Sequence, residues 1–395
     1  MASTPMDLDA VESSSPANGT PSTSLHITRT LGSNLPSTSA VADIIGNFRP
    51  TKQFKRTNVK DGQPQPYVLS LDFDDPGELL MTSESDESIQ IYKVREGRHD
   101  KQLLSKKYGV KLARFTRNSS SIIFASTQQN DAIRYLTTHD NAFIRYFEGH
   151  EAPVTCLAVH PGTDDFISCS KDNTVRLWNA STKHATGMLN LTTPFLSAFD
   201  PSGQIFAVAS PSAGQILLYD HRNFDKAPFS TFDVVDAGRY VETNMDNNNL
   251  LSGWTKLAFA NDGRTILLGT KGKGHFLLDS FNGSLKAYLQ KPEGRPNRLA
   301  PGEDATVNGG GWNGSNVEGS GDCCFSPDGR YVIGGTKKGV VVWDTLGQSD
   351  EKKVLAPCHT LEDPRQAAVV SFNPRFNFFA TADQDVVFWL PDQHA

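Results

Sequence analysis

The sequence predicts an all-β fold in which seven small sheets form a ring, a β-propeller, and a strand from near the N-terminus closes that ring. A pattern of three short strands separated by turns recurs seven times from about residue 68 onward. Where no insertion intervenes, successive copies end about 41 to 46 residues apart, which is the spacing of propeller blades. The 32 glycines and 22 prolines of the 395-residue chain supply the many turns that such a fold needs.

Each copy, or blade, begins with an apolar strand, turns through Asp, Asn, Pro and Gly into a second strand, and reaches a third strand after a tight polar turn. The third strands end on an aromatic residue or leucine, at Tyr92, Leu136, Trp178, Tyr219, Leu278, Trp343 and Trp389. Two longer intervals contain insertions at about 234–252 and 291–321. The second insertion is Gly-rich and polar, and we expect it to be disordered; alternatively its single tryptophan, Trp312, anchors a partner.

The two ends of the chain complete the domain organisation. Residues 1–43 are rich in Ser, Thr and Pro and cannot bury enough apolar surface to offset their ordering entropy, so we predict a disordered tail before a propeller at 44–395. The chain ends six residues after Trp389, too soon to add an outer strand to the last blade. We therefore expect the segment NFRPTKQF, Asn47 to Phe54, to supply that strand and remove an exposed sheet edge.

The third blade carries the most complete set of polar residues. His150 precedes its first strand, Ser168 and Ser170 lie on its second strand, Asp172 lies in the next turn, and Trp178 ends the third strand. These residues resemble the hydrogen-bonded His, Ser, Asp and Trp network of WD repeats. Because they occupy the repeat's own positions, we expect Asp172 to orient the His150 imidazole in a structural network rather than in a catalytic pair.

The composition excludes several classes of function. With a formal net charge of −6, the chain has no basic field for holding duplex nucleic acid. It has no run of about 18 apolar residues for a membrane helix, and its first 30 residues lack the pattern of a signal peptide, so we expect a soluble intracellular protein. The five cysteines show no Cys-x-x-Cys spacing, and we interpret them as reduced core thiols.

Motifs for catalysis, metal binding or cofactor binding are lacking. The segment GTKGKG at Gly269 to Gly274 resembles a phosphate loop, but it lies between two predicted strands with no helix after it, so we interpret it as a turn. The sequence contains neither a Gly-x-Ser-x-Gly elbow nor a Cys and His ligand spacing. We therefore predict that the protein is not an enzyme, holds no cofactor or metal, and acts by binding partners.

Charged residues mark a candidate binding face at the turns between second and third strands. Basic residues occupy these turns in blades five and six, at Lys271, Lys273, Lys337 and Lys338, whereas acidic residues occupy them in blades seven and one, at Asp383, Asp385, Glu84, Asp86 and Glu87. The basic half fits an acidic or phosphorylated peptide, which lysines bind by charge-assisted hydrogen bonds. The alternative is that these lysines only solvate the turns.

Several segments stand out beyond the generic repeat: SKKYG at 105–109, AIRYLTTHDNAFIRYFEGH at 132–150, LYDHRNFDKAPFSTF at 218–232, and FNPRFNFFATA with FWLPD at the C-terminus. Together they resemble one family, the WD-repeat subunit shared by COMPASS, a histone lysine methyltransferase complex, and by the nuclear cleavage and polyadenylation machinery with its phosphatase module. The resemblance implies a nuclear, non-catalytic scaffold that binds the N-terminal region of the methyltransferase. It also implies links to 3′-end processing, transcription termination and the phosphorylated tail of RNA polymerase II.

The family match and the predicted loops coincide at Lys106, Lys107, Tyr108 and Arg145, which we take as candidate partner-binding residues beside the four lysines. An alternative function comes from the segment Tyr219-Asp220-His221-Arg222, which resembles the Trp-Asp-x-Arg box of propellers that dock on cullin ubiquitin ligase adaptors. In that case the protein would be a substrate receptor. A third alternative, a propeller enzyme, lacks a convergent cluster of carboxylates or metal ligands.

Overall fold

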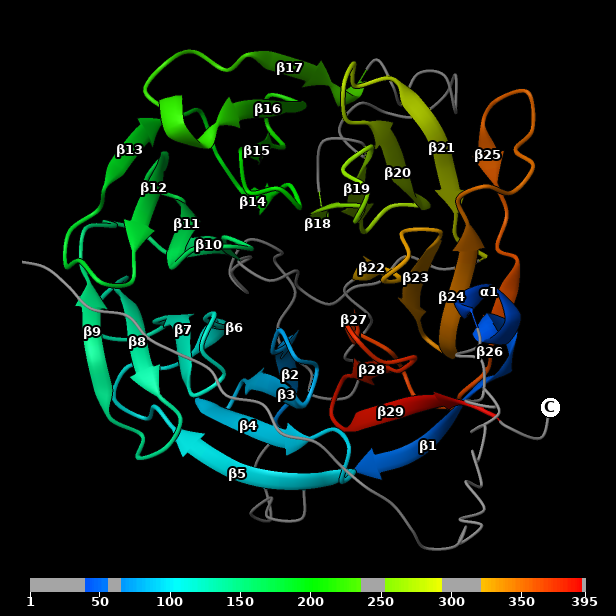
Figure 1. The fold of residues 1–395 in the computed structure, drawn as a ribbon, viewed down its shortest axis with the longest axis horizontal. Coiled ribbons are helices and arrows are strands. Elements are labelled where there is room, and N and C mark those ends of the chain that lie inside the picture. Colours follow the sequence, from blue (N-terminus) through cyan, green and yellow to red (C-terminus); the bar gives the residue numbers. More distant parts are fainter. Residues whose placement is uncertain (1–39, 56–64, 236–252, 293–320, 393–395) are drawn as a thin grey trace, which may run out of the picture. The chain divides into compact units, whose positions relative to one another are not determined.

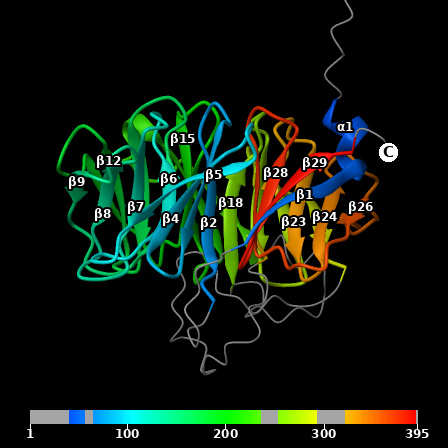
Figure 2. The same cartoon turned by 90° about the horizontal axis from the view of Figure 1, so that it is seen from below.

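Seven sheets, or blades, surround a common centre in the structure, a computed structural model that describes residues 40–55, 65–235, 253–292 and 321–392 (Figure 1). Six of these sheets have four strands and one has five. The described residues belong to one compact unit, Ala40–Ala395. Viewed from the side, the blades stand next to one another around the ring (Figure 2). The predicted fold class, a seven-bladed propeller, is confirmed. Residues 1–39 of the predicted tail, the greater part of both insertions and Trp312 lie outside the described residues.

The four strands of a blade are called a, b, c and d from the centre outward. Blades 1 to 4 each contain four consecutive antiparallel strands. They are, in blade 1, β2 (Val68–Phe73), β3 (Leu79–Glu84), β4 (Ser88–Lys93) and β5 (Arg98–Leu104); in blade 2, β6 (Lys111–Phe115), β7 (Ser121–Ala125), β8 (Ile133–Thr137) and β9 (Phe143–Phe147); in blade 3, β10 (Val154–Val159), β11 (Asp165–Ser170), β12 (Thr174–Asn179) and β13 (Gly187–Asn190); and in blade 4, β14 (Leu196–Phe199), β15 (Ile205–Ser210), β16 (Gln215–Asp220) and β17 (Ser230–Asp233).

Blades 5 to 7 depart from this simple order. Their strands are, in blade 5, β18 (Trp254–Phe259), β19 (Thr265–Thr270), β20 (Gly274–Asp279) and β21 (Leu285–Gln290), with β25 (Val354–Leu355) added; in blade 6, β22 (Cys323–Phe325), β23 (Tyr331–Thr336), β24 (Gly339–Asp344) and β26 (His359–Leu361); and in blade 7, β27 (Val369–Phe372), β28 (Phe379–Ala382), β29 (Val386–Pro391) and β1 (Phe48–Phe54). The described elements also include the short helices α1 (Val41–Ile44), η1 (Ile45–Asn47) and η2 (His221–Asn223).

The b strands are buried on both faces because each blade packs between two neighbours. In β7 every residue is buried. Ile122 and Phe124 pack in the cluster shared with blade 1, whereas Ile123 and Ala125 pack in the cluster shared with blade 3. Such strands therefore read as continuous apolar runs, while outer strands such as β13 alternate between half-buried and exposed residues.

The ring closes through β1, which pairs antiparallel with β29 so that Phe48 lies opposite Pro391 and Phe54 opposite Val386 (Figure 1). The outer strand of blade 7 thus comes from the N-terminal side, as the sequence predicted. The outer position also suits Pro50, which has no N–H for a further ladder. Phe48 is fully buried, with ring centroids 5.0 Å from Phe379 and 6.1 Å from Phe372.

Two features differ from the sequence analysis. Residues between β24 and β26 form β25, which pairs parallel with β21 and extends blade 5 by a fifth strand. A strand of two residues has no periodicity that a sequence could reveal.

The cysteines also differ from the prediction in one respect. Cys169 and Cys323 are buried free thiols, but Cys358 is exposed, so its interpretation as a core thiol is wrong. Among the described residues, no helix is long and apolar enough to cross a membrane.

Candidate partner-binding surfaces

The strands place two different sets of loops at the two ends of the ring. At one end, called the b–c face, the turns between b and c strands lie beside the loops that lead into the next blade. The Tyr108 carbonyl, for example, accepts the backbone N–H groups of Thr127 and Gln128 at 3.0 and 2.9 Å, and Lys271 N–H donates to the Gly253 carbonyl at 2.7 Å. At the other end, called the a–b face, lie the turns between a and b strands.

Lys106 lies on the b–c face in the loop after β5, where the acidic turn of blade 1 holds its side chain. Its ammonium lies 3.3 Å from the Glu87 carboxylate and also donates to the carbonyl of Asp86. The amide of Gln128 in blade 2 donates to the same Glu87 carboxylate at 3.2 Å. Much of the Lys106 charge is therefore neutralised within the protein, although its side chain is 59% exposed.

The neighbouring residues form an aromatic and cationic group that we call the Tyr108 cluster, consisting of Lys107, Tyr108, Arg134, Phe143 and Tyr146. The Arg134 guanidinium lies 3.3 Å from the centroid of the Tyr108 ring and 4.9 Å from that of Tyr146. The Lys107 ammonium lies 5.0 Å from the Tyr108 centroid, and its hydrogen bond is the main cause that lowers the pKa of Tyr108. Cations over aromatic faces are attracted by the ring quadrupole, so the cluster fixes this loop.

Arg134 was not singled out from the sequence. It is only 2% exposed, and it donates to Ser126 Oγ and Asn130 Oδ1, both at 2.8 Å. Burial lowers the pKa of Arg134. No carboxylate among the described residues lies within ion-pair distance of its guanidinium, so tyrosine rings and neutral acceptors compensate this buried charge. The sequence does contain a signal for Arg134, because it is a charged residue within the largely apolar strand β8.

Arg145 does not join this cluster. It lies on β9 next to Tyr146, and successive side chains of a strand point to opposite faces. Arg134 is paired with Tyr146 on the side that faces blade 1, whereas Arg145 is paired with Tyr135 on the other side. Arg145 donates to the carbonyl of Ala180 in blade 3. The structure thus brings Lys106, Lys107 and Tyr108 together and places Arg145 in a contact between blades.

We predict that Arg134→Met destabilises the protein by about 1–3 kcal/mol, because the cation and the donors to Ser126 and Asn130 are lost while the bulk is kept. Urea unfolding followed by circular dichroism measures the change, and the near-ultraviolet tyrosine signal reports the loop. Arg145→Met is the matched control and should cost less than about 1 kcal/mol while leaving that tyrosine signal unchanged. Equal losses in the two variants would contradict this role of Arg134.

The four lysines of blades 5 and 6 lie on the b–c face in the turns after β19 and β23. Lys273, Lys337 and Lys338 are exposed, and Lys271 is half-buried beside Gly253. On the acidic side, Asp86 and Asp385 are half-buried in their turns. The expectation that Glu84 contributes to this surface is wrong, since Glu84 is only 4% exposed. It ends a b strand, where both faces are covered.

A chain of hydrogen bonds connects the polar residues of blade 3. Trp178 Nε1–H donates to Ser168 Oγ at 2.8 Å, and Ser168 lies 2.6 Å from His150 Nε2. His150 Nδ1 lies 2.8 Å from Asp172 Oδ2. Because a carboxylate only accepts, Nδ1 carries the imidazole proton and Nε2 accepts from the serine hydroxyl. His150, Ser168 and Trp178 are buried and the Asp172 side chain is only 9% exposed, and the direct contact of His150 with Asp172 leaves no room for a substrate between them.

Burial and hydrogen bonding set the protonation states in this chain. Burial lowers the pKa of His150, so the imidazole is neutral. Burial by itself would raise the pKa of Asp172, but hydrogen bonds from Thr174, His150 and the backbone of Glu151 outweigh it and lower that pKa to about 2. Ser170 accepts the backbone N–H of Asp172 at 3.2 Å, which fixes the turn.

The segment resembling a cullin-docking box forms a local turn. Asp220 ends β16, and its carboxylate accepts the backbone N–H of Arg222 at 2.9 Å and the side-chain amide of Asn223 at 2.7 Å. Asp220 therefore serves as the N-cap of η2. Among the described residues, no group of three or more His, Cys, Asp and Glu side chains is arranged to hold a metal ion.

Comparisons with known proteins agree with the fold. The family model described as "WD domain, G-beta repeat" matches residues 141–179 and 315–344. The first match runs from the outer strand of blade 2 through strands a, b and c of blade 3, which is how this repeat maps onto blades.

Three relatives match along nearly their whole length. "Set1 complex component swd2" of Schizosaccharomyces pombe is 30% identical over 89% of this chain and 99% of its own. "WD repeat-containing protein 82" of Drosophila melanogaster is 34% identical over 89% and 96%, and "COMPASS component SWD2" of Saccharomyces cerevisiae is 33% identical over 86% and 96%. Since these relatives are 30–34% identical over 86–89% of this chain, the chain belongs to the family of WD-repeat proteins that includes Swd2 and WD repeat-containing protein 82.

Proposed function

We propose that this protein is a non-catalytic scaffold subunit of a nuclear histone methyltransferase complex of the COMPASS type. The observation that carries the proposal is the match, at 30–33% identity and over almost their full length, to relatives named as components of the Set1 complex and of COMPASS. The geometry supports a scaffold because the polar network of blade 3 is buried and the turns present charged and aromatic surfaces. Its partner in this complex is the N-terminal region of the catalytic subunit.

The proposal extends to a second assembly. The sequence resemblance implies that the protein also works with polyadenylation and phosphatase subunits in mRNA 3′-end processing and transcription termination. A scaffold that serves both assemblies would link them to RNA polymerase II through its phosphorylated tail. Exposed lysines such as Lys338, with no carboxylate at ion-pair distance among the described residues, suit phosphate groups on such a peptide.

Affinity purification of the tagged protein from nuclear extract, with quantitative mass spectrometry, tests the assignment. We expect methyltransferase subunits at near-equal stoichiometry, and polyadenylation and phosphatase subunits in a second set. Recovery of a cullin adaptor with neither set would instead support the substrate-receptor alternative, and recovery of none of these proteins would contradict the scaffold proposal.

The phosphopeptide contact has its own test. The double variant Lys337→Glu and Lys338→Glu should weaken binding of a serine-phosphorylated polymerase-tail peptide at least about tenfold, measured by fluorescence anisotropy. A matched double reversal at exposed lysines away from the b–c face, Lys183→Glu and Lys226→Glu, should leave the affinity within about twofold. Comparing both with Lys106→Glu and Lys107→Glu shows whether the loop after β5, which carries Lys106 and part of the Tyr108 cluster, takes part. Equal affinity of the phosphorylated and unphosphorylated peptides would refute the contact.

A further inference from the structure

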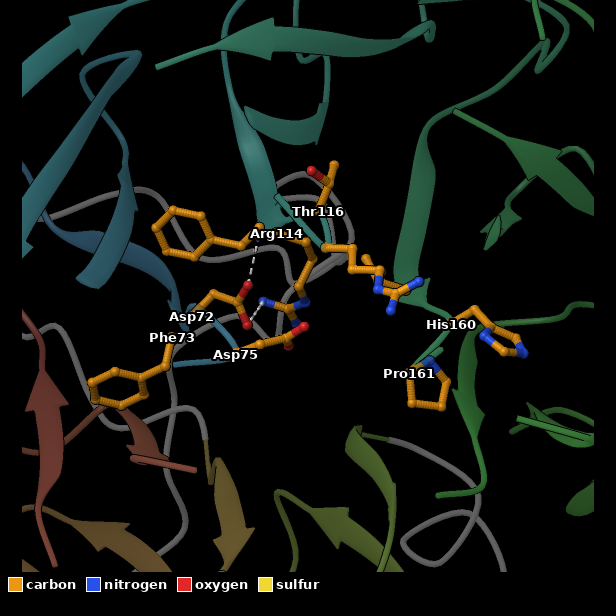
Figure 3. A pocket seen from close by; sticks show the side chains of 10 residues that line it. Asp72, Phe73, Asp75, Arg114, Thr116, His160 and Pro161 are labelled. Carbon is orange, nitrogen blue, oxygen red and sulfur yellow. Dashed lines mark hydrogen bonds and ion pairs between the residues drawn. The ribbon is translucent and has the colours of Figure 1, made fainter. Parts of the chain in front are cut away.

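A polar pocket with a volume of about 270 Å³ opens on the a–b face, where blades 1, 2 and 3 meet (Figure 3). Asp72 and Asp75 line it from blade 1, Arg114 and Arg117 from blade 2, and His160 from blade 3. It lies at the opposite end of the strands from the Tyr108 cluster and from the lysines of blades 5 and 6. A binding event here would therefore be separate from the contacts proposed above.

The carboxylate of Asp72 is only half satisfied. Its Oδ2 atom accepts the backbone N–H of Phe115 at 2.7 Å, which ties blade 1 to blade 2. Its Oδ1 atom lies 3.9 Å from Arg114 Nη1, beyond hydrogen-bond distance, and has no donor among the described residues. The side chain is 24% exposed, and Figure 3 shows it pointing into the pocket beside Arg114. Asp75, one turn further on, is exposed and its carboxylate likewise has no partner among the described residues.

The basic residues of the pocket are bound to main-chain groups instead. Arg114 Nη1 donates to the carbonyl of Ala113 at 3.3 Å, and Arg117 Nη1 donates to that of Gly162 at 2.9 Å. Both ring nitrogens of His160 are used, since Nδ1 accepts the Gly162 backbone N–H at 2.9 Å and Nε2 contacts a carbonyl of blade 4. The two arginines of the pocket thus donate to carbonyls, while Asp72 Oδ1 and the Asp75 carboxylate have no hydrogen-bond donor among the described residues.

The electrostatics of Asp72 point the same way. Desolvation raises the pKa of Asp72 to about 6, against the lowering effects of Arg114, the Phe115 backbone and Lys256, and the charge of Asp75 adds to the rise. The neighbouring cations therefore do not fully compensate the ionised carboxylate. An additional cation placed in the pocket would be stabilised by both carboxylates and would return the pKa of Asp72 toward its ordinary value.

We propose that this pocket binds an arginine side chain of a partner peptide, with Asp72 Oδ1 and the Asp75 carboxylate as its acceptors. A guanidinium offers several coplanar donors and is the cation best matched to carboxylates in a partly desolvated site. A metal ion is the poorer occupant, because the described residues supply only these two carboxylates here. The pocket is smaller than that of a drug-sized ligand, which suits one inserted side chain.

The test uses the full-length protein and a blocked pentapeptide with a central arginine flanked by alanines, whose binding is followed by ligand-observed NMR titration. A second peptide with citrulline in place of the arginine keeps the shape and removes the charge. We expect saturable binding of the arginine peptide alone. The affinity should rise severalfold between about pH 5 and pH 7.5, because Asp72 loses its proton through a pKa of about 6 in this range.

Three variants make the assignment specific. Asp72→Asn keeps an acceptor for the Phe115 backbone and should weaken arginine binding at least about fivefold and abolish its pH dependence. Asp75 is exposed, so Asp75→Asn should leave the fold unchanged. This variant should also weaken binding of the arginine peptide. Asp262→Asn, an exposed carboxylate in the a–b turn of blade 5, is the matched control and should change nothing. Equal binding of the citrulline peptide, unchanged affinity in both pocket variants, or no saturable binding of the arginine peptide would each overturn the proposal.

Discussion

Phe48→Ala is expected to lower the free energy of unfolding by about 3–5 kcal/mol. The ring of Phe48 is fully buried against Phe379 and Phe372 and belongs to the cluster that joins β1 to blades 6 and 7. Truncation of Phe48 leaves a cavity where β1, from the N-terminal side of the chain, joins the last blade. The exposed edge of β29 then becomes available for pairing with other chains.

Urea unfolding and size-exclusion chromatography measure these two consequences. The matched control is Lys52→Ala, an exposed residue of the same strand, which should change stability by less than about 0.5 kcal/mol. We further expect Phe48→Ala to elute partly as oligomers. If Phe48→Ala and Lys52→Ala were equally stable, β1 would not be the strand that closes the ring.

Asp172→Ala is the second large effect, with an expected loss of about 2–4 kcal/mol at neutral pH. The carboxylate accepts hydrogen bonds from His150, Thr174 and the backbone of Glu151, and its side chain is only 9% exposed. Removing it leaves the His150 Nδ1–H group buried without an acceptor. Chemical denaturation gives the magnitude, and Asp165→Ala, which removes a half-buried carboxylate of the same blade, gives the comparison. A smaller loss in Asp172→Ala than in Asp165→Ala would contradict the role of the network.

The pH dependence separates the charge of Asp172 from its hydrogen bonds. The pKa of Asp172 is about 2 in the folded protein, below its unfolded value near 4, so its contribution is present above about pH 4 and is lost as the pH falls toward 2. Asp172→Asn keeps acceptor atoms but does not titrate. We expect wild type to lose about 1–2 kcal/mol more than Asp172→Asn between about pH 4 and pH 2. Parallel curves for the two proteins would show that the carboxylate charge does not contribute.

The repeat pattern predicted the blades because local sequence and final burial agree in them. Alternation along outer strands and continuous apolar runs along b strands follow from packing between two neighbours, and turn residues mark the blade ends. The closing strand was predicted for a different reason: the last copy lacked a fourth strand, and the segment ahead of the first copy contained Phe48 and Phe54. Strand β25 was not predictable, since only the nearby edge of β21 makes those two residues a strand.

The residues of the candidate sites also fall into two groups, those that the sequence predicted and those that only the tertiary structure brought together. The sequence by itself determined the number of blades, the family, the turn positions of Lys337 and Lys338, and the residues of the blade 3 network, because these depend on spacing along the chain. Only the tertiary structure decided that Arg134 stacks on Tyr108 while Arg145 contacts blade 3, and that Asp72 and Arg114 share a pocket. Those pairs come from different strands or blades, and closure of the ring sets the distances between them.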